Sequence, residues 1–387
     1  MTCTGVAGGR WRATVTAWGA IVPWDDSAEI DWFIAADDRW HRPQHETATR
    51  QTTLEGTPVV ETRVRIPTGD AVQVVYSVAD AGGLTIIEVT NDSTLPMAVA
   101  FTGGELLSRR PPASMAPQGI ELPADAVLFP VGHHATITVA RAHAGSAAAM
   151  PDTVPSAAQV VRGWLAQTER ASRLRLPDAA LVEAVTAARC ELLLNGPLVE
   201  DDPSALLLGI DELVRLGHAP AIWVPEIAAL LEQLARFGAQ IPGGVMEGAA
   251  RVLHAAGEHR AVDDLRRLVV RAATDSDAMP ASPGSIPAWV ERQLVTSDEF
   301  AAQLLPRGFA PGWLGVDFEA HGLAIGLASH LSFAIRWHGD RPAVLWEITG
   351  PPMSLRYEGW STAELTGEAL WPAPTTGRAP GLPRRPR

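Results

Sequence analysis

The first part of the chain alternates hydrophobic and polar residues with a period of two. Val60, Val64 and Ile66 are separated by charged side chains, and a similar run over residues 72–78 follows the turn Pro67-Thr68-Gly69-Asp70. This alternation places every second side chain on one face of a β-strand, so the two runs predict a hairpin. Further short strands are predicted at residues 11–18, 30–34, 84–90, 97–101, 126–129 and 136–140.

The middle of the chain has the period of an α-helix instead. Leu181, Val185, Ala188 and Leu192 recur at spacings of four, three and four residues, which places them on one helix face. Four more segments with this period are predicted as helices, at residues 206–213, 227–237, 246–253 and 262–269. Because the connections between them are short, consecutive helices should form antiparallel hairpins.

The last hundred residues return to strands, and the turn between two of them predicts their register. Gly339-Asp340 separates two alternating segments, and glycine at the first central position suits a type II′ turn. Counting outward from the turn predicts the pairs Trp337–Pro342, Ile335–Val344, Phe333–Trp346 and Leu331–Ile348 on one apolar face, with Arg336–Ala343 and Ser332–Glu347 on the other.

These patterns predict an α+β multidomain protein. We expect an N-terminal antiparallel β-sandwich over residues 1–150, a central all-α domain of helical hairpins over residues 156–306, and a β segment over residues 307–371. A lone hairpin is unstable, so the C-terminal strands are expected to return to the sandwich and complete it. Residues 372–387 are rich in proline and arginine and are predicted to be disordered.

Composition excludes several classes of function. The 387 residues carry a formal net charge of −13, so the basic face that nucleic acid or an anionic membrane requires is not expected. The chain contains no lysine, which excludes Schiff-base chemistry and a phosphate-binding P-loop, and no cofactor is expected. Cys3 and Cys190 cannot form a disulfide framework. No secretion signal or run of 18 apolar residues is present, so we expect a cytoplasmic protein.

The predicted order of elements resembles the six-hairpin glycosidase class, whose members place a β-sandwich before an (α/α) toroid. Four strings together resemble a family of uncharacterised actinobacterial proteins: Asp37-Asp38-Arg39-Trp40-His41, Pro58-Val59-Val60-Glu61-Thr62-Arg63, Gly69-Asp70-Ala71-Val72 and Arg336-Trp337-His338-Gly339. The resemblance implies a carbohydrate-active or carbohydrate-binding protein. Six complete hairpins need twelve helices, whereas residues 156–306 have room for about six or seven, so we expect a half-toroid.

Glycoside hydrolysis requires two carboxylates that face one sugar. Acidic residues are found near the predicted helix starts, at Glu200, Asp201, Asp202, Glu226 and Glu247. No catalytic motif of the glycosidases matches them residue by residue, and we take Asp202 and Glu247 as the candidate acid/base pair. A structural role is the alternative, because aspartate is a common N-cap residue and an acidic residue in a first helical turn complements the helix dipole.

Trp40, His41 and Trp223 are the candidate sugar-binding residues. Aromatic area beside charged and polar groups suits a polyhydroxylated ligand, and Trp40 and His41 lie next to Asp38 and Arg39. The alternatives are that Arg39 forms a solvated ion pair with a neighbouring aspartate, that Trp40 fills the interface between the sandwich and the helices, and that Trp223 packs between helical hairpins.

One further cluster has the spacing of a site on a strand. Asp317, Glu319 and His321 alternate with other residues, so an extended chain would place all three on one face. The set could hold a metal or provide acid–base groups, but an exposed polar strand face has the same pattern, and we assign no metal to it.

Two classes of function follow from the sequence. The first is a cytoplasmic carbohydrate-active or carbohydrate-binding protein, with a glycan as ligand. The second is a non-catalytic interaction protein that has lost part of the toroid. An open half-toroid would expose apolar helix faces, which the sandwich, a second copy in a homodimer, or a protein partner would have to cover.

Overall fold

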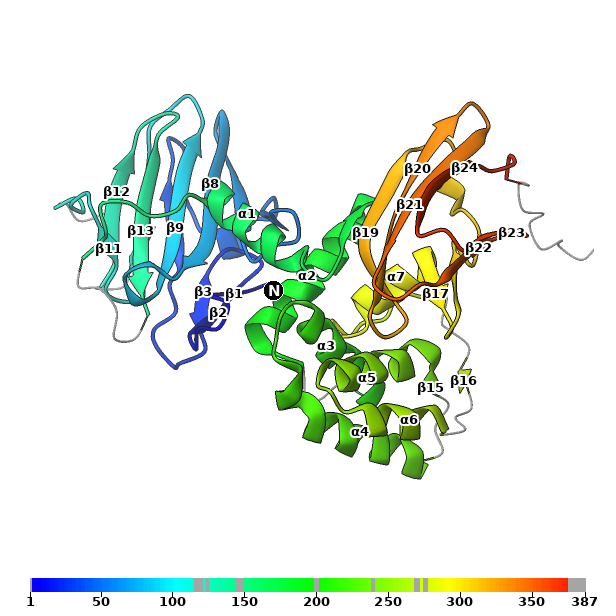
Figure 1. The fold of residues 1–387 in the computed structure, drawn as a ribbon. Helices are drawn as coiled ribbons and strands as arrows, with labels where there is room; N and C mark the ends of the chain where they lie inside the picture. The colour runs from blue at the N-terminus through cyan, green and yellow to red at the C-terminus, as the bar shows by residue number, and fades with distance from the viewer. Residues whose placement is uncertain are drawn as a thin grey trace, which may run out of the picture. The chain divides into compact units, whose positions relative to one another are not determined.

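The structure is a computed structural model that describes residues 2–114, 121–122, 125–143, 149–197, 202–237, 241–267, 272–273 and 278–374. These residues form a mixed α+β protein with several antiparallel sheets and seven α-helices (Figure 1). In this part of the chain no helix combines the length and the apolar character that crossing a membrane requires. The predicted disordered tail, residues 372–387, lies almost wholly outside the described residues. Two compact units divide the chain: Met1–Thr168 with Glu183–Gly196, and Glu169–Val182 with Pro197–Arg387.

The first unit contains three antiparallel sheets. A three-stranded sheet has the order β1 (Thr2–Gly5), β2 (Arg12–Val15), β3 (Ile21–Pro23). A four-stranded sheet has the order β12 (Val127–Val131), β10 (Met97–Phe101), β4 (Trp32–Ala35), β5 (Trp40–His41). A six-stranded sheet has the order β11 (Leu107–Ser108), β13 (Thr136–Ala142), β9 (Leu84–Asp92), β8 (Gly69–Val78), β7 (Val60–Ile66), β6 (Arg50–Thr53). Short 3₁₀ turns, η1 (Pro43–His45) and η2 (Asp80–Gly82), lie in two of the connections.

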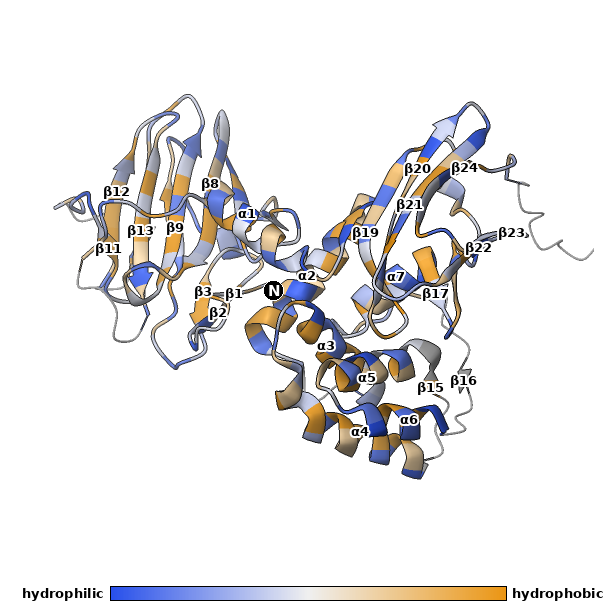
Figure 2. Ribbon diagram, in the orientation of Figure 1, coloured by the Kyte–Doolittle hydropathy of each residue, from blue (hydrophilic) through white to orange (hydrophobic). Residues whose placement is uncertain are grey.

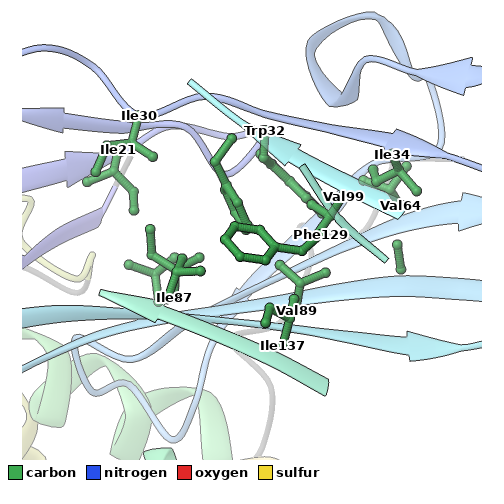
Figure 3. Packing of buried hydrophobic residues seen from close by; sticks show 14 of the residues in the cluster. Ile21, Ile30, Trp32, Ile34, Val64, Ile87, Val89, Val99, Phe129 and Ile137 are labelled. Carbon is green, nitrogen blue, oxygen red and sulfur yellow. The ribbon is translucent and has the colours of Figure 1, made fainter. Parts of the chain in front are cut away.

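One hydrophobic cluster takes side chains from all three of these sheets. Figure 3 shows Trp32 and Phe129, from β4 and β12, on one side of this core and Ile87 and Val89, from β9, on the other. The Trp32 side chain is fully buried, and its indole N–H donates to the carbonyl of Trp18 at 2.9 Å. Burial of this apolar surface is the main term that stabilises the unit.

The predicted N-terminal hairpin is confirmed, and its second strand is buried on both faces. β7 pairs with β8 across a two-residue connection, with Val60 opposite Val75. One face of β8 contributes Val75 to the main core, while Tyr76 on the other face belongs to a second cluster that includes Val161 of α1 (Ala157–Thr168). The periodicity argument did not identify α1, which covers this outer face.

Helix α2 (Ala179–Asn195) contains the four residues of the predicted helix face. The Asp178 carboxylate accepts hydrogen bonds from the amides of Ala180 and Leu181, at 3.1 and 3.4 Å, as an N-cap residue does. Cys190 on this helix packs with Trp164 of α1 and is buried. That burial raises the pKa of the Cys190 thiol, so it behaves as a small apolar group.

The helices of the second unit confirm four of the predicted periods. They are α3 (Pro203–Arg215), α4 (Val224–Phe237), α5 (Gly243–Ala255) and α6 (His259–Arg267), with α7 (Ile286–Leu294) and the 3₁₀ turn η3 (Pro220–Trp223) in addition. A shared hydrophobic cluster includes Ile210 of α3, Ile227 of α4, Val245 of α5 and Val262 of α6. Figure 2 shows hydrophobic and hydrophilic stretches along each of these helices, as the periodicity requires.

The remaining strands of the second unit form three sheets. A five-stranded antiparallel sheet has the order β14 (Arg173–Arg175), β19 (Phe318–Ile325), β20 (Ser329–His338), β21 (Arg341–Thr349), β24 (Thr366–Leu370). A four-stranded sheet has the order β17 (Val295–Ser297), β18 (Ala301–Leu304), β22 (Ser354–Tyr357), β23 (Trp360–Thr362). Two short strands, β15 (Ile241–Pro242) and β16 (Ala272–Ala273), pair in parallel, and the 3₁₀ turn η4 (Pro311–Trp313) precedes β19.

The register predicted for the C-terminal hairpin is confirmed at every pair. β20 and β21 place Trp337 opposite Pro342 and continue residue by residue to Leu331 opposite Ile348. Gly339 has a φ of 68°, the left-handed conformation that a two-residue turn requires at this position. The short turn leaves the two strands no freedom to slip, so the alternation decides which face is buried.

The prediction that the C-terminal strands complete a sheet of the N-terminal part is wrong for the described residues. Within them, β19, β20, β21 and β24 pair only with one another and with β14. The apolar face that was expected to need the sandwich finds partners nearby in the chain. Phe333 packs edge-on against Phe318, whose ring also contacts Trp313 at a centroid distance of 5.1 Å. This local aromatic core makes the sheet self-sufficient.

Candidate functional site

The starts of three helices in the second unit border one cavity of about 700 Å³, which we call the α3–α5–α7 cavity. Its polar and aromatic lining comes from α3, α7 and the segment after α7, while α5 contributes Gly244 and Val245. The polar and aromatic residues are Asp202 and Ser204 at α3, Ser285, Trp289, Arg292 and Gln293 at α7, then Thr296 and Arg307. Cavities of this size are typical of small-molecule sites. We therefore take this cavity as the candidate functional site.

Close packing of α5 and α7 shapes one wall of the cavity. The Arg292 side chain runs past Gly244, where an added β-carbon would lie 3.1 Å from Arg292 Cδ. A larger residue at position 244 would force this side chain to move. The Arg292 guanidinium also forms an ion pair with Glu247, with 3.6 Å between Nη1 and Oε2. Arg292 therefore connects the cavity to the second of the predicted catalytic carboxylates.

Asp202 is the N-cap residue of α3. Its Oδ1 accepts hydrogen bonds from the backbone amides of Ser204 and Ala205, at 2.8 and 3.1 Å. Pro203 occupies the first helical position, where its missing N–H costs nothing. The carboxylate thus performs the structural role that the sequence offered as an alternative, and it also lines the cavity.

Glu247 lies in the second turn of α5 because the helix begins at Gly243, so its expected place in the first turn is wrong. Its side chain is partly exposed and lines a neighbouring cavity of about 220 Å³, together with Met246 and Glu299. Asp202 and Glu247 thus line different cavities in the same unit. Their action as an acid/base pair stays a prediction.

Trp223 ends η3 and packs, partly buried, against the hydrophobic cluster of α3 to α6. Its ring stacks on His218 at a centroid distance of 6.5 Å and an interplanar angle of 24°. The indole Nε1 is buried and has no hydrogen-bond partner among the described residues. These contacts correspond to the interior role considered for Trp223, and a sugar contact stays a prediction.

Trp40 and His41 form β5 at the edge of the four-stranded sheet, in the first unit. The His41 ring is buried and lies between two carboxylates, with Nε2 2.9 Å from Asp38 Oδ1 and Nδ1 3.2 Å from Glu46 Oε1. Arg39 binds both oxygens of Glu46, at 2.6 and 3.0 Å, and approaches Asp38 only to 3.9 Å. The main partner of Arg39 is therefore Glu46 rather than an aspartate.

These contacts change the acidity of both carboxylates. The hydrogen bond from His41 lowers the pKa of Asp38, and the hydrogen bonds from Arg39 lower the pKa of Glu46. Both groups are therefore held in the charged form, and the cluster is a closed ion-pair network. Such a network orders the loop after β4, whereas a sugar contact at Trp40 or His41 stays a prediction.

The cluster of Asp317, Glu319 and His321 is divided between different partners. Glu319 binds Arg336 at 2.5 Å and lies 3.5 Å from His321 Nε2, whereas Asp317 accepts the backbone N–H of Trp337 at 2.9 Å. Across the described ranges, no three His, Cys, Asp or Glu side chains are arranged to hold a metal ion. The Arg336 guanidinium occupies the position beside Glu319 that a cation would take.

Sequence reasoning missed three residues of the cavity: Trp289, Arg292 and Arg307. They lie about a hundred residues from Asp202 in the chain, and α7 was not among the predicted helices. The available signal was the segment Ser285-Ile286-Pro287, an N-cap residue type followed by an early proline, which is typical of a helix start.

A scan against protein-family models and a search of the curated proteins found no match for this chain.

Proposed function

We propose that this protein binds a carbohydrate in the α3–α5–α7 cavity. The observation that carries the proposal is the presence, in one cavity, of the Trp289 indole together with side chains that donate and accept hydrogen bonds, such as Gln293 and Ser204. A sugar ring has a flat C–H face and a rim of hydroxyl groups, so it needs apolar area and directional polar groups at once.

The polar lining and the helix starts favour a sugar that carries an acidic group. Arg292 and Arg307 line the cavity with Asp202, which caps α3, and Arg292 also pairs with Glu247 at 3.6 Å. The starts of α5 and α7 also face it, and neither helix has an acidic residue in its first turn. Helix N-termini and arginines both favour an anion. We therefore expect uronic-acid or sulfated sugars to bind better than neutral ones.

The architecture inferred from the sequence belongs to the same proposal. The first unit would be the β-sandwich and α3 to α6 the shortened (α/α) toroid of a protein related to the six-hairpin glycosidases. Glycoside hydrolysis by Asp202 and Glu247 is the catalytic form of the proposal. Arg292 supports it because this residue lines the same cavity as Asp202 and pairs with Glu247, and a cation can hold one carboxylate in its charged form while the other is protonated.

A glycan array that includes uronic-acid and sulfated glycans tests the binding. We expect signals for acidic glycans and at least about a tenfold weaker affinity for Trp289→Ala, because an aromatic platform is worth a kcal/mol or more. Trp24→Ala is the matched control, since Trp24 is 54% exposed in the first unit and lies outside the cavity. An array without any signal, or equal affinities for the two variants, would refute the proposal.

Two substitutions at Asp202 separate capping from catalysis. Asparagine caps a helix as well as aspartate does, so Asp202→Asn should keep the stability, whereas Asp202→Ala should lower it by about 1 kcal/mol. If Asp202 is an acid/base group, Asp202→Asn abolishes hydrolysis of any glycan that the array identifies, at unchanged thermal stability. Hydrolysis that persists in Asp202→Asn would remove this residue from catalysis.

The non-catalytic interaction protein is the second candidate. It is favoured by two large apolar side chains on the surface of the second unit, Phe300 at 72% and Ile222 at 64% exposure. A large exposed aromatic or aliphatic side chain is the type of residue that anchors a protein contact. A stable dimer in light scattering, lost in Phe300→Ser, combined with an array without signal would favour this function over carbohydrate binding.

A further inference from the structure

The first unit contains a cavity of about 610 Å³ between the β1–β2 loop and the η2 turn. Trp11 and His143 both line it, and their rings stack at a centroid distance of 4.1 Å and an interplanar angle of 13°. Arg10 and Asp25 lie at its exposed rim. We call this cavity the Trp11–His143 pocket; it is separate from the α3–α5–α7 cavity and from the His41 network.

A chain of hydroxyl groups determines which nitrogen of His143 carries the proton. The Thr4 hydroxyl donates to the carbonyl of Pro58 at 3.4 Å, so its oxygen is the acceptor for Ser77 at 3.2 Å. Ser77 in turn accepts from Thr85 at 3.1 Å, which leaves Thr85 to accept from His143 Nε2 at 3.0 Å. With donation in this direction along the chain, Nε2 is the protonated nitrogen and Nδ1 presents a lone pair, which is the tautomer that we assign.

The imidazole is neutral, and its Nδ1 makes no hydrogen bond within the described residues. Burial lowers the pKa of His143 to about 4. Of the nearby charges, Asp25 raises this pKa and Arg12 lowers it. A β-carbon on Gly83 would lie 2.3 Å from Nδ1, and Gly83 has a φ of 109° that disfavours any other residue. A side chain at position 83 would therefore collide with the imidazole at Nδ1.

The walls of the pocket are held in place without a ligand. The Arg12 guanidinium donates to the carbonyls of Val6 and Trp11, at 3.1 and 2.8 Å, at the two ends of the β1–β2 loop. It also donates through Nε to the carbonyl of Leu194 near the end of α2, at 3.0 Å. The backbone N–H of His143 donates to the carbonyl of Gly83 at 3.0 Å. A preorganised pocket loses little entropy when it binds.

We propose that the Trp11–His143 pocket binds a neutral hydroxylated ring, with the ring against the Trp11 indole and one hydroxyl donating to His143 Nδ1. The opposite charges of Arg10 and Asp25 give the lining no net charge, which distinguishes it from the arginine-rich cavity of the second unit. A sugar ring fits these groups, and this choice of ligand class rests on the proposed carbohydrate binding.

Calorimetric titration of the full chain with neutral methyl glycosides (gluco, galacto and manno) tests the proposal. Trp11→Ala should weaken binding at least about tenfold. Ala79→Trp, at an exposed position of the rim, should do the same by filling the pocket without disturbing the core. Trp24→Ala is the control and should bind normally. An NMR spectrum that correlates imidazole protons with nitrogen should show the Nδ1 resonance of His143 moving on addition of the glycoside.

The outcomes separate this proposal from the binding of acidic sugars. The proposal for the Trp11–His143 pocket is overturned if neutral glycosides do not bind. It is also overturned if their binding is lost in Trp289→Ala but unchanged in Trp11→Ala and Ala79→Trp. An acidic-glycan signal that depends on Trp289 would still stand in that case. In the converse result, binding of neutral glycosides is lost in Trp11→Ala and Ala79→Trp while no acidic glycan gives a signal. That result supports ligand binding in the Trp11–His143 pocket and refutes carbohydrate binding in the α3–α5–α7 cavity.

Discussion

Replacing Arg215 with methionine is expected to lower the free energy of unfolding by about 3–5 kcal/mol. Arg215 on α3 binds Glu212 on the same helix at 2.7 Å and Glu291 on α7 at 2.8 Å. Both carboxylates are buried, at 2% and 7% exposure. The substitution removes a cation that both of them share, and a buried charge whose partner is deleted is strongly destabilising.

The two carboxylates keep the Arg215 guanidinium protonated. Burial by itself lowers the pKa of Arg215, but the carboxylates of Glu212 and Glu291 outweigh that effect and raise it. Ser172 also donates to Glu291 at 2.6 Å, and the neighbouring Asp211 binds Arg251 of α5 at 2.5 Å. The network therefore joins α3, α5 and α7, the three helices that border the candidate cavity.

Chemical denaturation followed by circular dichroism measures the effect. Arg236→Met is the matched control: Arg236 pairs with Glu232 at 2.6 Å, but both side chains are more than 60% exposed, so a loss below about 1 kcal/mol is expected. Adding Glu212→Gln and Glu291→Gln to Arg215→Met should recover part of the stability, because it removes the charges that lost their cation. Equal losses for Arg215→Met and Arg236→Met would contradict the argument.

Replacing Trp371 with alanine is expected to cost about 3–5 kcal/mol. Trp371 is 1% exposed and stacks on Tyr357 at a centroid distance of 3.8 Å and an interplanar angle of 10°. It also contacts Trp360 at 5.7 Å, and its backbone carbonyl accepts from Arg341 at 3.1 Å. The ring thus joins residues of the four-stranded sheet to the end of β24, and its loss leaves a large cavity in this aromatic core.

Leu370→Ala provides the control, because Leu370 is the preceding residue and is 49% exposed; a change below about 1 kcal/mol is expected. Trp371→Phe should recover most of the loss. The indole Nε1 is without a hydrogen-bond partner in the described part of the chain, so phenylalanine sacrifices no polar contact. Thermal denaturation of the three variants measures the order, and a Trp371→Ala variant as stable as Leu370→Ala would contradict it.

The local parts of the fold could be predicted because they depend on neighbours in the chain. The β20–β21 register follows from one turn, and the N-cap at Asp202 follows from residues two and three positions away. Helix α1 and the sheet to which β19 to β21 belong could not be predicted in this way. Both depend on apolar faces that meet partners far along the chain, such as Val161 against Tyr76.

The candidate site shows the same division. Asp202 was recognised as a candidate because its neighbours mark a helix start, but Trp289 and Arg307 carry no local signal of a shared cavity. Likewise Trp11 and His143 are 132 positions apart and become a stacked pair only when β13 ends beside the β1–β2 loop. Neither pocket could be assembled from spacing alone.

The sequence alone predicted five of the seven α-helices of the described residues, the β7–β8 and β20–β21 hairpins, the register of the second hairpin, and the reaction types that a chain without lysine excludes. Only the tertiary structure decided which apolar faces pair, where Glu247 and Asp202 point, and which side chains share a cavity. The reason is physical. Hydrogen bonds within a helix or hairpin act between near neighbours in the chain, so a short segment predicts them. Burial instead depends on shape complementarity between distant surfaces, and the hydrophobic effect alone does not specify which apolar face packs against which.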